Sequence, residues 1–152
     1  MTLILITGLS GTGKSTLIAE LRARGHRAYE ADDGFSEPRP DGEMGWKVAA
    51  VAELFRNHAG EGPLFFAGCS EEQELFTFDH KVLLTAPSQV MRQRLATRLG
   101  NDYGKAADEL RTALGYLHTV EPLLRATADT IIETTVSPTL VADEVLDAVG
   151  WP

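Results

Sequence analysis

The residues best suited to chemistry stand together near the start of the chain, in one glycine-rich stretch. Its sequence, G-L-S-G-T-G-K-S-T, matches the pattern G-x-x-x-x-G-K-[ST] at every fixed position. In such a loop, backbone N–H groups bind phosphate oxygens, the lysine reaches the outer phosphates, and the serine hydroxyl joins the ligands of Mg²⁺. We therefore predict a site for a nucleoside triphosphate and Mg²⁺. Its residues are Gly8, Leu9, Ser10, Gly11, Thr12, Gly13, Lys14, Ser15 and Thr16.

The segments on either side of this stretch support the interpretation. Residues 2–7, T-L-I-L-I-T, form an apolar and β-branched run typical of a buried strand. Residues 16–22 have a helical pattern that stops before Gly25. A strand, a glycine loop and a helix in this order direct the helix N-terminus at the phosphates. The alternative is a glycine-rich turn without a ligand, and the presence of both Lys14 and Ser15 counts against it.

Two adjacent carboxylates, Asp32 and Asp33, follow a second predicted strand at residues 26–31. Because the carboxyl ends of parallel strands share one edge of a sheet, we expect this pair to face the glycine loop. We assign Asp33 to accept a proton from an attacking hydroxyl and Asp32 to orient a water molecule bound to Mg²⁺. The residues alone leave the reverse assignment open. The structural alternative is an ordinary turn, since Asp-Asp-Gly is common turn chemistry.

Two arginines, Arg94 and Arg98, stand four residues apart on a helix predicted over residues 87–99, which should bury Leu99. At this spacing they share one helix face. They precede a polar segment, about residues 99–107, that we interpret as a mobile lid. We predict that both guanidiniums close over the nucleotide, and that they join Lys14 and Asp33 as catalytic residues. The alternative is a solvated basic helix face.

The remaining pattern alternates strands and helices. Further strands are predicted at residues 64–67, 81–85 and 130–135. Further helices are predicted at residues 44–57, from residue 110 with a restart at Pro122, and from residue 138, where Ser137 is the N-cap. Residues 35–45 are predicted to be loop, and 71–78 a short acidic link. Five strands that alternate with helices indicate an α/β fold with a parallel sheet. We expect one domain over residues 1–152, with the acceptor-site region at about 33–60.

Composition narrows the possible partners. The formal net charge is −8, which disfavours a general nucleic-acid surface because such a surface needs an excess of basic residues. No apolar run approaches the ~20 residues needed to span a bilayer, and no leader pattern opens the chain. We therefore expect a cytoplasmic protein without a membrane partner, either monomer or homodimer. Its single cysteine, Cys69, excludes an internal disulfide.

Several of these motifs together resemble the small P-loop kinases, typified by nucleoside monophosphate kinases and shikimate kinase. Residues 82–87, V-L-L-T-A-P, and 90–98, V-M-R-Q-R-L-A-T-R, are similar to the strand and helix that carry the R-x-x-x-R lid arginines of these kinases. Residues 108–124 resemble the helix after the lid in adenylate kinases. The D-G-x-P-R motif of adenylate kinases is missing, and A-G-C-S at residues 67–70 stands in its place, closer to the glycine-rich turn of shikimate kinase.

The resemblance implies a three-layer P-loop NTPase fold and a kinase that transfers the γ-phosphoryl group of Mg-ATP to a small molecule. The acceptor is either a nucleoside monophosphate or a hydroxyl compound, and the Asp pair with the missing D-G-x-P-R motif favours a hydroxyl. The alternative function is a nucleotide-binding protein or ATPase that acts as a switch. The absence of an N-K-x-D motif and of a carboxylate directly after residues 64–67 counts against a switch.

Overall fold

A parallel sheet lies at the centre of the computed structural model, which describes residues 2–58 and 62–151. Its strand order is β2-β5-β1-β6-β7, with β1 in the middle. The five strands are β1 (Leu3–Thr7), β2 (Arg27–Glu30), β5 (Leu64–Ala67), β6 (His80–Thr85) and β7 (Thr130–Glu133). The predicted parallel sheet is therefore confirmed. Because β1 is central, the glycine loop that follows it leaves from the middle of the sheet edge where ligands bind in such folds.

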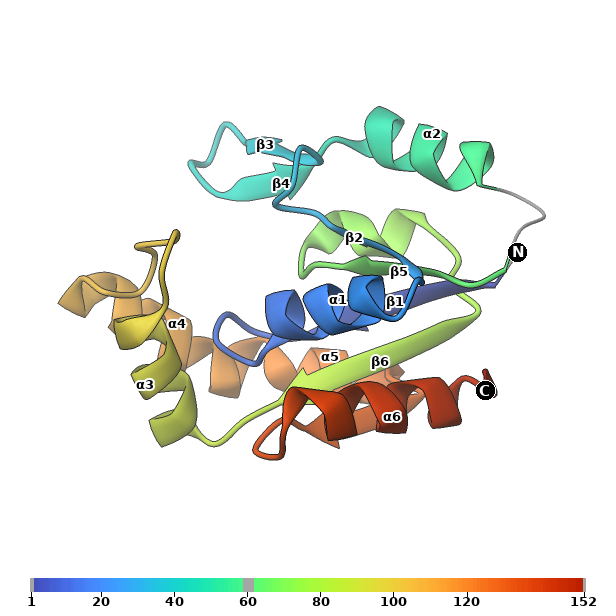
Figure 1. Ribbon diagram of the computed structural model, residues 1–152. Coiled ribbons are helices and arrows are strands. Elements are labelled where there is room, and N and C mark those ends of the chain that lie inside the picture. The colour runs from blue at the N-terminus through green and yellow to red at the C-terminus, as the bar shows by residue number, and fades with distance from the viewer. Residues whose placement is uncertain (1, 59–61, 152) are drawn as a thin grey trace.

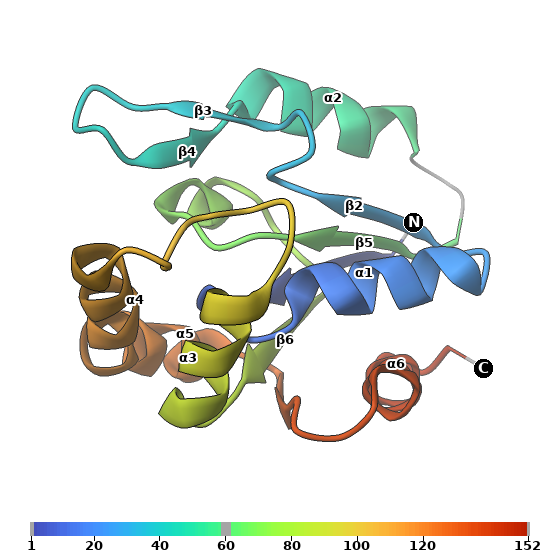
Figure 2. The same ribbon diagram turned by 60° about the vertical axis from the view of Figure 1, so that its left-hand side comes forward.

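Helices cover both faces of this sheet and make three layers (Figures 1 and 2). On one face, α1 (Lys14–Ala23) and α6 (Pro138–Ala148) pack on Ile4 and Ile6 of β1. On the other face, α2 (Val48–Asn57) packs near Leu5 and Phe66, and α5 (Glu121–Thr127) contributes Leu124 against β6. The remaining two helices, α3 (Ser88–Thr97) and α4 (Ala107–Thr119), lie at the end of the molecule where the glycine loop opens. The predicted three-layer fold is confirmed.

The segment between β2 and α2 differs from the prediction. Instead of a loop followed by a helix from residue 44, it forms an antiparallel hairpin of β3 (Ser36–Pro38) and β4 (Met44–Trp46), and α2 begins only at Val48. The turn runs through Pro40, Asp41 and Gly42, and the φ of 86° at Gly42 suits glycine. Trp46 is 4% exposed and packs on Phe66, so tertiary packing outweighs the helical pattern here. Residues 59 and 60 of the predicted acceptor-site region lie outside the described residues.

The predicted lid begins where α3 ends. Thr97 is the last residue of α3, and Arg98 has an extended backbone with φ −64° and ψ 148°. Leu99 was expected to be buried on the helix but is 94% exposed, because the helix stops before it. Residues 98–106 contain neither helix nor strand, and α4 begins at Ala107. Both views show this segment at the same end of the molecule as the β3–β4 hairpin (Figures 1 and 2).

Three smaller expectations concern the connecting segments. The acidic link after β5 contains a 3₁₀-helix, η1 (Glu71–Leu75). Pro122 lies in the first turn of α5, so the helix restarts as predicted. Ser137 caps α6 by accepting a hydrogen bond from the backbone N–H of Leu140, as predicted. In the described part of the chain, no helix has the length and apolar character to cross a membrane.

Candidate active site

The glycine loop, residues 8–13, turns sharply between the end of β1 and the start of α1. Gly8 has a φ of 151°, and a Cβ atom on it would lie 2.6 Å from the carbonyl oxygen of Leu84 and 2.7 Å from the Thr12 hydroxyl. Only glycine fits this close approach to β6. Gly11 and Gly13 also have positive φ values, of 86° and 98°. The loop therefore has the open backbone that a phosphate cradle requires.

Lys14 is the first residue of α1, and its side chain bends back over the loop. Its Nζ donates hydrogen bonds to the carbonyl oxygens of Gly8, at 2.5 Å, and Leu9, at 2.9 Å. Burial lowers the pKa of this ammonium, while the nearby Cys69 and Asp32 act in the opposite direction. Two neutral carbonyls are weak partners for an enclosed cation. The ammonium is thus held ready for a stronger, anionic partner.

Ser15 stands beside a residue that the sequence analysis did not single out. Its hydroxyl donates a hydrogen bond to Glu30 Oε1 at 2.5 Å. Glu30 is the last residue of β2, and that position was the signal that could have found it. Within residues 2–58 and 62–151, no group of three His, Cys, Asp or Glu side chains could hold a metal ion. A magnesium ion at Ser15 would therefore take most of its oxygen ligands from phosphates and water.

The structure separates the two aspartates. Asp32 lines the cavity in front of the glycine loop and contributes to the electrostatic environment of both Lys14 and Arg98. Asp33 points elsewhere: its side chain is 73% exposed and its Oδ2 lies 3.8 Å from Arg22 Nη2. It is not among the described residues that line the cavity. The structure therefore does not bring the predicted base, Asp33, to the site, and Asp32 is the carboxylate that reaches it.

Arg94 is bound to the glycine loop through a buried threonine, Thr134. Arg94 Nη1 donates to Thr134 Oγ1 at 2.8 Å and to Gly11 O at 3.2 Å, and Nη2 donates to Thr134 O. The Thr134 hydroxyl in turn donates to the carbonyl of Thr12 at 2.6 Å. Thr134 follows β7 and is 5% exposed. It was not predicted as a site residue, because a lone threonine after a strand carries no motif.

Arg98 lies in the same cavity but is not stacked with Arg94 on one helix face. The helix ends before it, and Arg98 Nη2 donates to the carbonyl of Tyr103 at 2.7 Å. Its Nε is buried without a hydrogen-bond partner among the described residues. Burial lowers the pKa of the Arg98 side chain, and Asp32 and Tyr103 act against that shift. The prediction of a shared helix face was therefore wrong, although both side chains line the cavity.

A cavity of about 1480 Å³ joins these groups. What we call the donor part is lined by the glycine loop, the end of α3 and residues after β7, with Lys14, Arg94 and Arg98 as its charged side chains. What we call the acceptor part is lined by residues between Glu30 and Trp46, by residues 68–74, and by Tyr103 and Tyr116. The hairpin and the predicted lid thus both contribute residues to the lining of one cavity.

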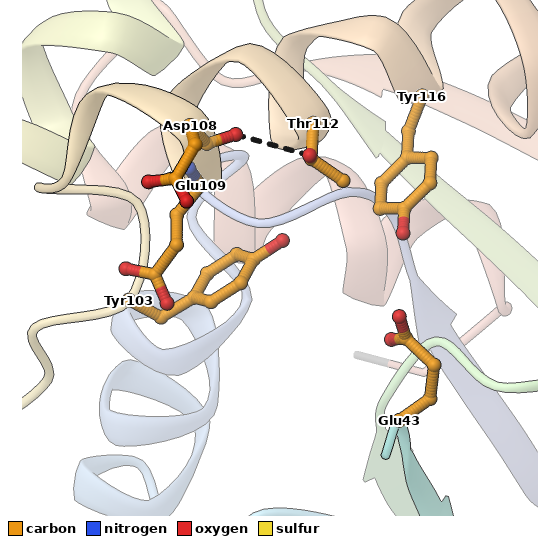
Figure 3. Close-up of a pocket in the computed structure, with 6 residues that line it drawn as sticks. All are labelled: Glu43, Tyr103, Asp108, Glu109, Thr112 and Tyr116. Atoms are coloured by element: carbon orange, nitrogen blue, oxygen red, sulfur yellow. Dashed lines mark hydrogen bonds between the residues drawn. The ribbon is translucent and has the colours of Figure 1, made fainter. Parts of the chain in front are cut away.

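A smaller pocket of about 220 Å³ adjoins the acceptor part (Figure 3). The two share Glu43 of the hairpin, Tyr103 of the lid and Tyr116 of α4. Figure 3 shows the Tyr116 hydroxyl directed toward the Glu43 carboxylate. Burial raises the pKa of Tyr103, and so do Tyr116, Glu43 and Glu109, whereas Arg98 lowers it. The surroundings of this phenol therefore disfavour additional negative charge.

Comparison with protein families places these features in a known group. A family model described as an AAA domain matches residues 4–115. The chain belongs to this family of P-loop proteins. The match includes the glycine loop, Asp32, the hairpin, both lid arginines and most of α4. Comparison with curated proteins gives no match.

Solved structures of small kinases share the fold over almost the whole chain. Shikimate kinase from Acinetobacter baumannii, in complex with shikimate, is 14% identical with a TM-score of 0.66, and the match covers 98% of this chain and 93% of that one. A gluconokinase from Sinorhizobium meliloti 1021 is 22% identical with a TM-score of 0.65, covering 98% and 91%. An unliganded sugar kinase from Janibacter sp. HTCC2649 is 17% identical with a TM-score of 0.65, covering 99% and 95%. The predicted small P-loop kinase fold is therefore confirmed.

The Thr134 hydroxyl gives a testable prediction. Thr134→Val keeps the shape of the side chain but leaves the Thr12 carbonyl and one Arg94 N–H without their partner. We expect the free energy of unfolding to fall by about 1–3 kcal/mol, and binding of Mg-ADP to weaken because the loop loses its support. Urea unfolding and calorimetry measure the two effects. Thr119→Val removes an exposed hydroxyl from α4 as the control, and equal behaviour of the two variants would contradict the role given to Thr134.

Proposed function

We propose that this protein is an ATP-dependent kinase that phosphorylates a hydroxyl group of a small molecule. The observation that carries the proposal is that Lys14 and Asp32 line one cavity, which continues from the glycine loop to the β3–β4 hairpin. A phosphate-binding cation and a proton-accepting carboxylate are the two groups that such a transfer uses at its centre. The shared fold of small-molecule kinases agrees with this assignment.

The donor part fits Mg-ATP by the chemistry of its residues. The loop N–H groups and Lys14 would hold the outer phosphates, and Ser15 and the nearby Glu30 would hold Mg²⁺ and its water ligands. Arg98 lines the cavity beside the loop, so its guanidinium is available to the phosphate chain from the lid side. Bound Mg-ATP supplies the transferable phosphoryl group, with its charge partly neutralised by the metal. The predicted nucleotide site and its cofactors thus remain our proposal for residues 8–16 and Arg94.

In the acceptor part, Asp32 would take the proton from the attacking hydroxyl. The new bond forms between that oxygen and the γ-phosphorus, the bond to the bridging oxygen breaks, and ADP leaves with the electron pair. Arg94 holds the loop in place, while Lys14 and Arg98 stabilise charge on the transferring group. The lid at about residues 99–107 would exclude water once both substrates are bound. We propose that residues 1–152 act as one domain.

Two features favour a hydroxyl acceptor over a nucleoside monophosphate. Asp32 faces the cavity, and a phosphate acceptor needs no general base. The acceptor part also carries several carboxylates, which repel a second phosphate. The alternative, a nucleotide-hydrolysing switch, requires a surface for a partner protein. It does not account for a cavity that extends beyond the phosphate loop to the hairpin.

Lys14→Ala tests the donor site. We expect loss of Mg-ADP binding and a drop in kcat/KM of at least a hundredfold, because the variant lacks the cation that reaches the outer phosphates. The melting temperature should change by no more than about 2–4 °C, because the native lysine bonds only carbonyls that water can also solvate. Calorimetry and acceptor-dependent ADP release measure these effects. A variant that keeps full transfer across an acceptor panel would contradict the kinase, and ADP release indifferent to every acceptor would favour the switch.

Asp32→Asn tests the acceptor side. We expect kcat with a hydroxyl acceptor to fall by about 10²–10⁴, because an amide does not accept the proton. Binding of Mg-ADP should stay within about threefold of wild type. Asp33→Asn is the matched control: it removes the same charge one residue away, at a side chain outside the cavity lining, and should retain most activity. Greater loss from Asp33→Asn than from Asp32→Asn would restore the original assignment of Asp33 as the base.

A further inference from the structure

Charge is divided unevenly along the cavity. Among the described residues that line it, the cations of the donor part are Lys14, Arg94 and Arg98, all next to the loop. The acceptor part has Arg39 as its basic residue, and its carboxylates are Glu30, Asp32, Asp41, Glu43, Glu71 and Glu74. Glu30 and Asp32 are the two that the proposed function assigns to Mg²⁺ and to the reacting hydroxyl. The other four lie on the hairpin and in η1, on the acceptor's side of the cavity.

Arg39 does not offset these carboxylates, because its guanidinium is already surrounded by acids. Its Nη1 lies 3.3 Å from Glu72 Oε1 and 3.7 Å from Glu71 Oε2, and its Nε lies 3.8 Å from Asp41 Oδ1. Burial opposes ionisation of Glu72, but the hydrogen bond from Ser70 and the charge of Arg39 lower its pKa overall. One cation therefore faces three carboxylates. Its charge is therefore already more than balanced by the protein's own acids, although its Nε makes no hydrogen bond to a described residue.

The pocket in Figure 3 adds a second observation of a different kind. Its wall consists of three carboxylates, two phenol rings and one threonine, with no basic side chain among the lining residues described: Glu43, Tyr103, Asp108, Glu109, Thr112 and Tyr116. Carboxylates beside aromatic faces are the groups that bind an ammonium ion, by charge and by cation–π attraction. Glu43 forms no ion pair with any described residue, so its carboxylate has no cation of its own.

We propose that the acceptor is a hydroxyl compound that carries a protonated amino group, such as an amino sugar or an aminocyclitol. This inference rests on the proposed kinase function and names the substrate class of the same site. The ammonium group binds between Glu43, Tyr103 and Tyr116, while a hydroxyl of the same molecule lies at Asp32. The amino group keeps its proton and does not react. Because hairpin and lid both contribute to its binding, this group also connects the two sides of the cavity.

Charge rules out the opposite class of acceptor for this site. A sugar acid or a phosphorylated sugar would bring a second anion beside the ATP phosphates, into a region where the nearby carboxylates are not neutralised. Two solved structures with this fold are a shikimate kinase and a gluconokinase, and both enzymes are named for compounds with a carboxylate. The acidic acceptor part thus separates this chain from those two enzymes in substrate class while it shares their fold.

The test compares polyhydroxyl probes of similar size that differ in charge. D-glucosamine, D-glucose and D-gluconate form one series, and 2-deoxystreptamine, myo-inositol and shikimate form another. Binding of each to the full chain with saturating Mg-ADP is measured by calorimetry, and transfer is measured as ATP-dependent ADP release. We expect the cationic member of at least one series to bind at least tenfold more tightly than its neutral and anionic partners. That preference should shrink at 0.5 M salt, where charge is screened.

Glu43→Gln and its matched control test whether the preference for the cationic probe arises at the pocket in Figure 3. Glu43→Gln should raise the Kd and KM for the cationic probe by about threefold to thirtyfold, consistent with one partly exposed charge pair plus its aromatic contact. Glu37→Gln removes the same charge from β3 of the same hairpin, at an exposed residue outside both pockets, and should leave the values at wild-type level. Tyr116→Leu should weaken the cationic probe and spare D-glucose.

Each outcome decides the proposal. Tighter binding of D-gluconate or shikimate, equal binding across each series, or no binding by any probe while Mg-ADP binds would overturn it. Equal effects of Glu43→Gln and Glu37→Gln would overturn the assigned pocket. In all of these cases, ADP release that requires some acceptor of a wider panel and disappears in Lys14→Ala leaves the kinase assignment standing. Wild-type protein that binds no Mg-ADP would instead remove the proposed function itself.

Discussion

The passage of the glycine loop beneath the end of β6 is the constraint on which the rest of the site depends. Gly8 approaches the Leu84 carbonyl so closely that no side chain fits, which fixes the direction of the loop as it leaves β1. The loop then bends around the Lys14 ammonium, and Thr134 joins it to the end of β6 and to Arg94. The central strand β1, the glycine loop and the helix α3 are therefore connected, and a displacement of any of them disturbs the phosphate cradle.

Much of the fold was readable from sequence because it depends on local rules. The apolar run of β1, the glycine loop and the Ser137–Pro138 helix start each combine a short motif with a strong backbone preference. The hairpin between β2 and α2 was missed because its strands are short and their pairing depends on Trp46 packing against Phe66, a contact far apart in sequence. The end of α3 was missed for a related reason, since the exposed Leu99 continued a periodic pattern without any contact to support it.

The site shows the same division between motif and context. The backbone course of residues 8–15 could be predicted, because the glycine pattern between a strand and a helix fixes it. The binding roles of these residues stay predictions. The roles of Asp32 and Asp33 could not be told apart from the sequence. The two residues are adjacent, and only the backbone conformation decides that Asp32 lines the cavity while Asp33 lies near Arg22. Thr134 carries no motif as a single residue, and the sequence signal for Glu30 is its place near the end of a predicted strand. They become recognisable only when the sheet places the ends of β2 and β7 beside the loop.

The groups that would hold a nucleotide are bonded within the protein in this structure, and that affects both affinity and selectivity. Lys14 binds loop carbonyls and Ser15 binds Glu30. A phosphate or a magnesium ion must replace these hydrogen bonds. Each new contact therefore contributes to binding only the difference in free energy between the new bond and the old one. That difference is large for Lys14, because an anion replaces neutral carbonyls next to an enclosed ammonium. For Ser15 the gain in free energy is large only when the metal accompanies the phosphates, because the Ser15 hydroxyl already donates a hydrogen bond to Glu30. We therefore expect the proposed site to favour the magnesium complex of a nucleotide over the free nucleotide, although the chain as a whole is acidic.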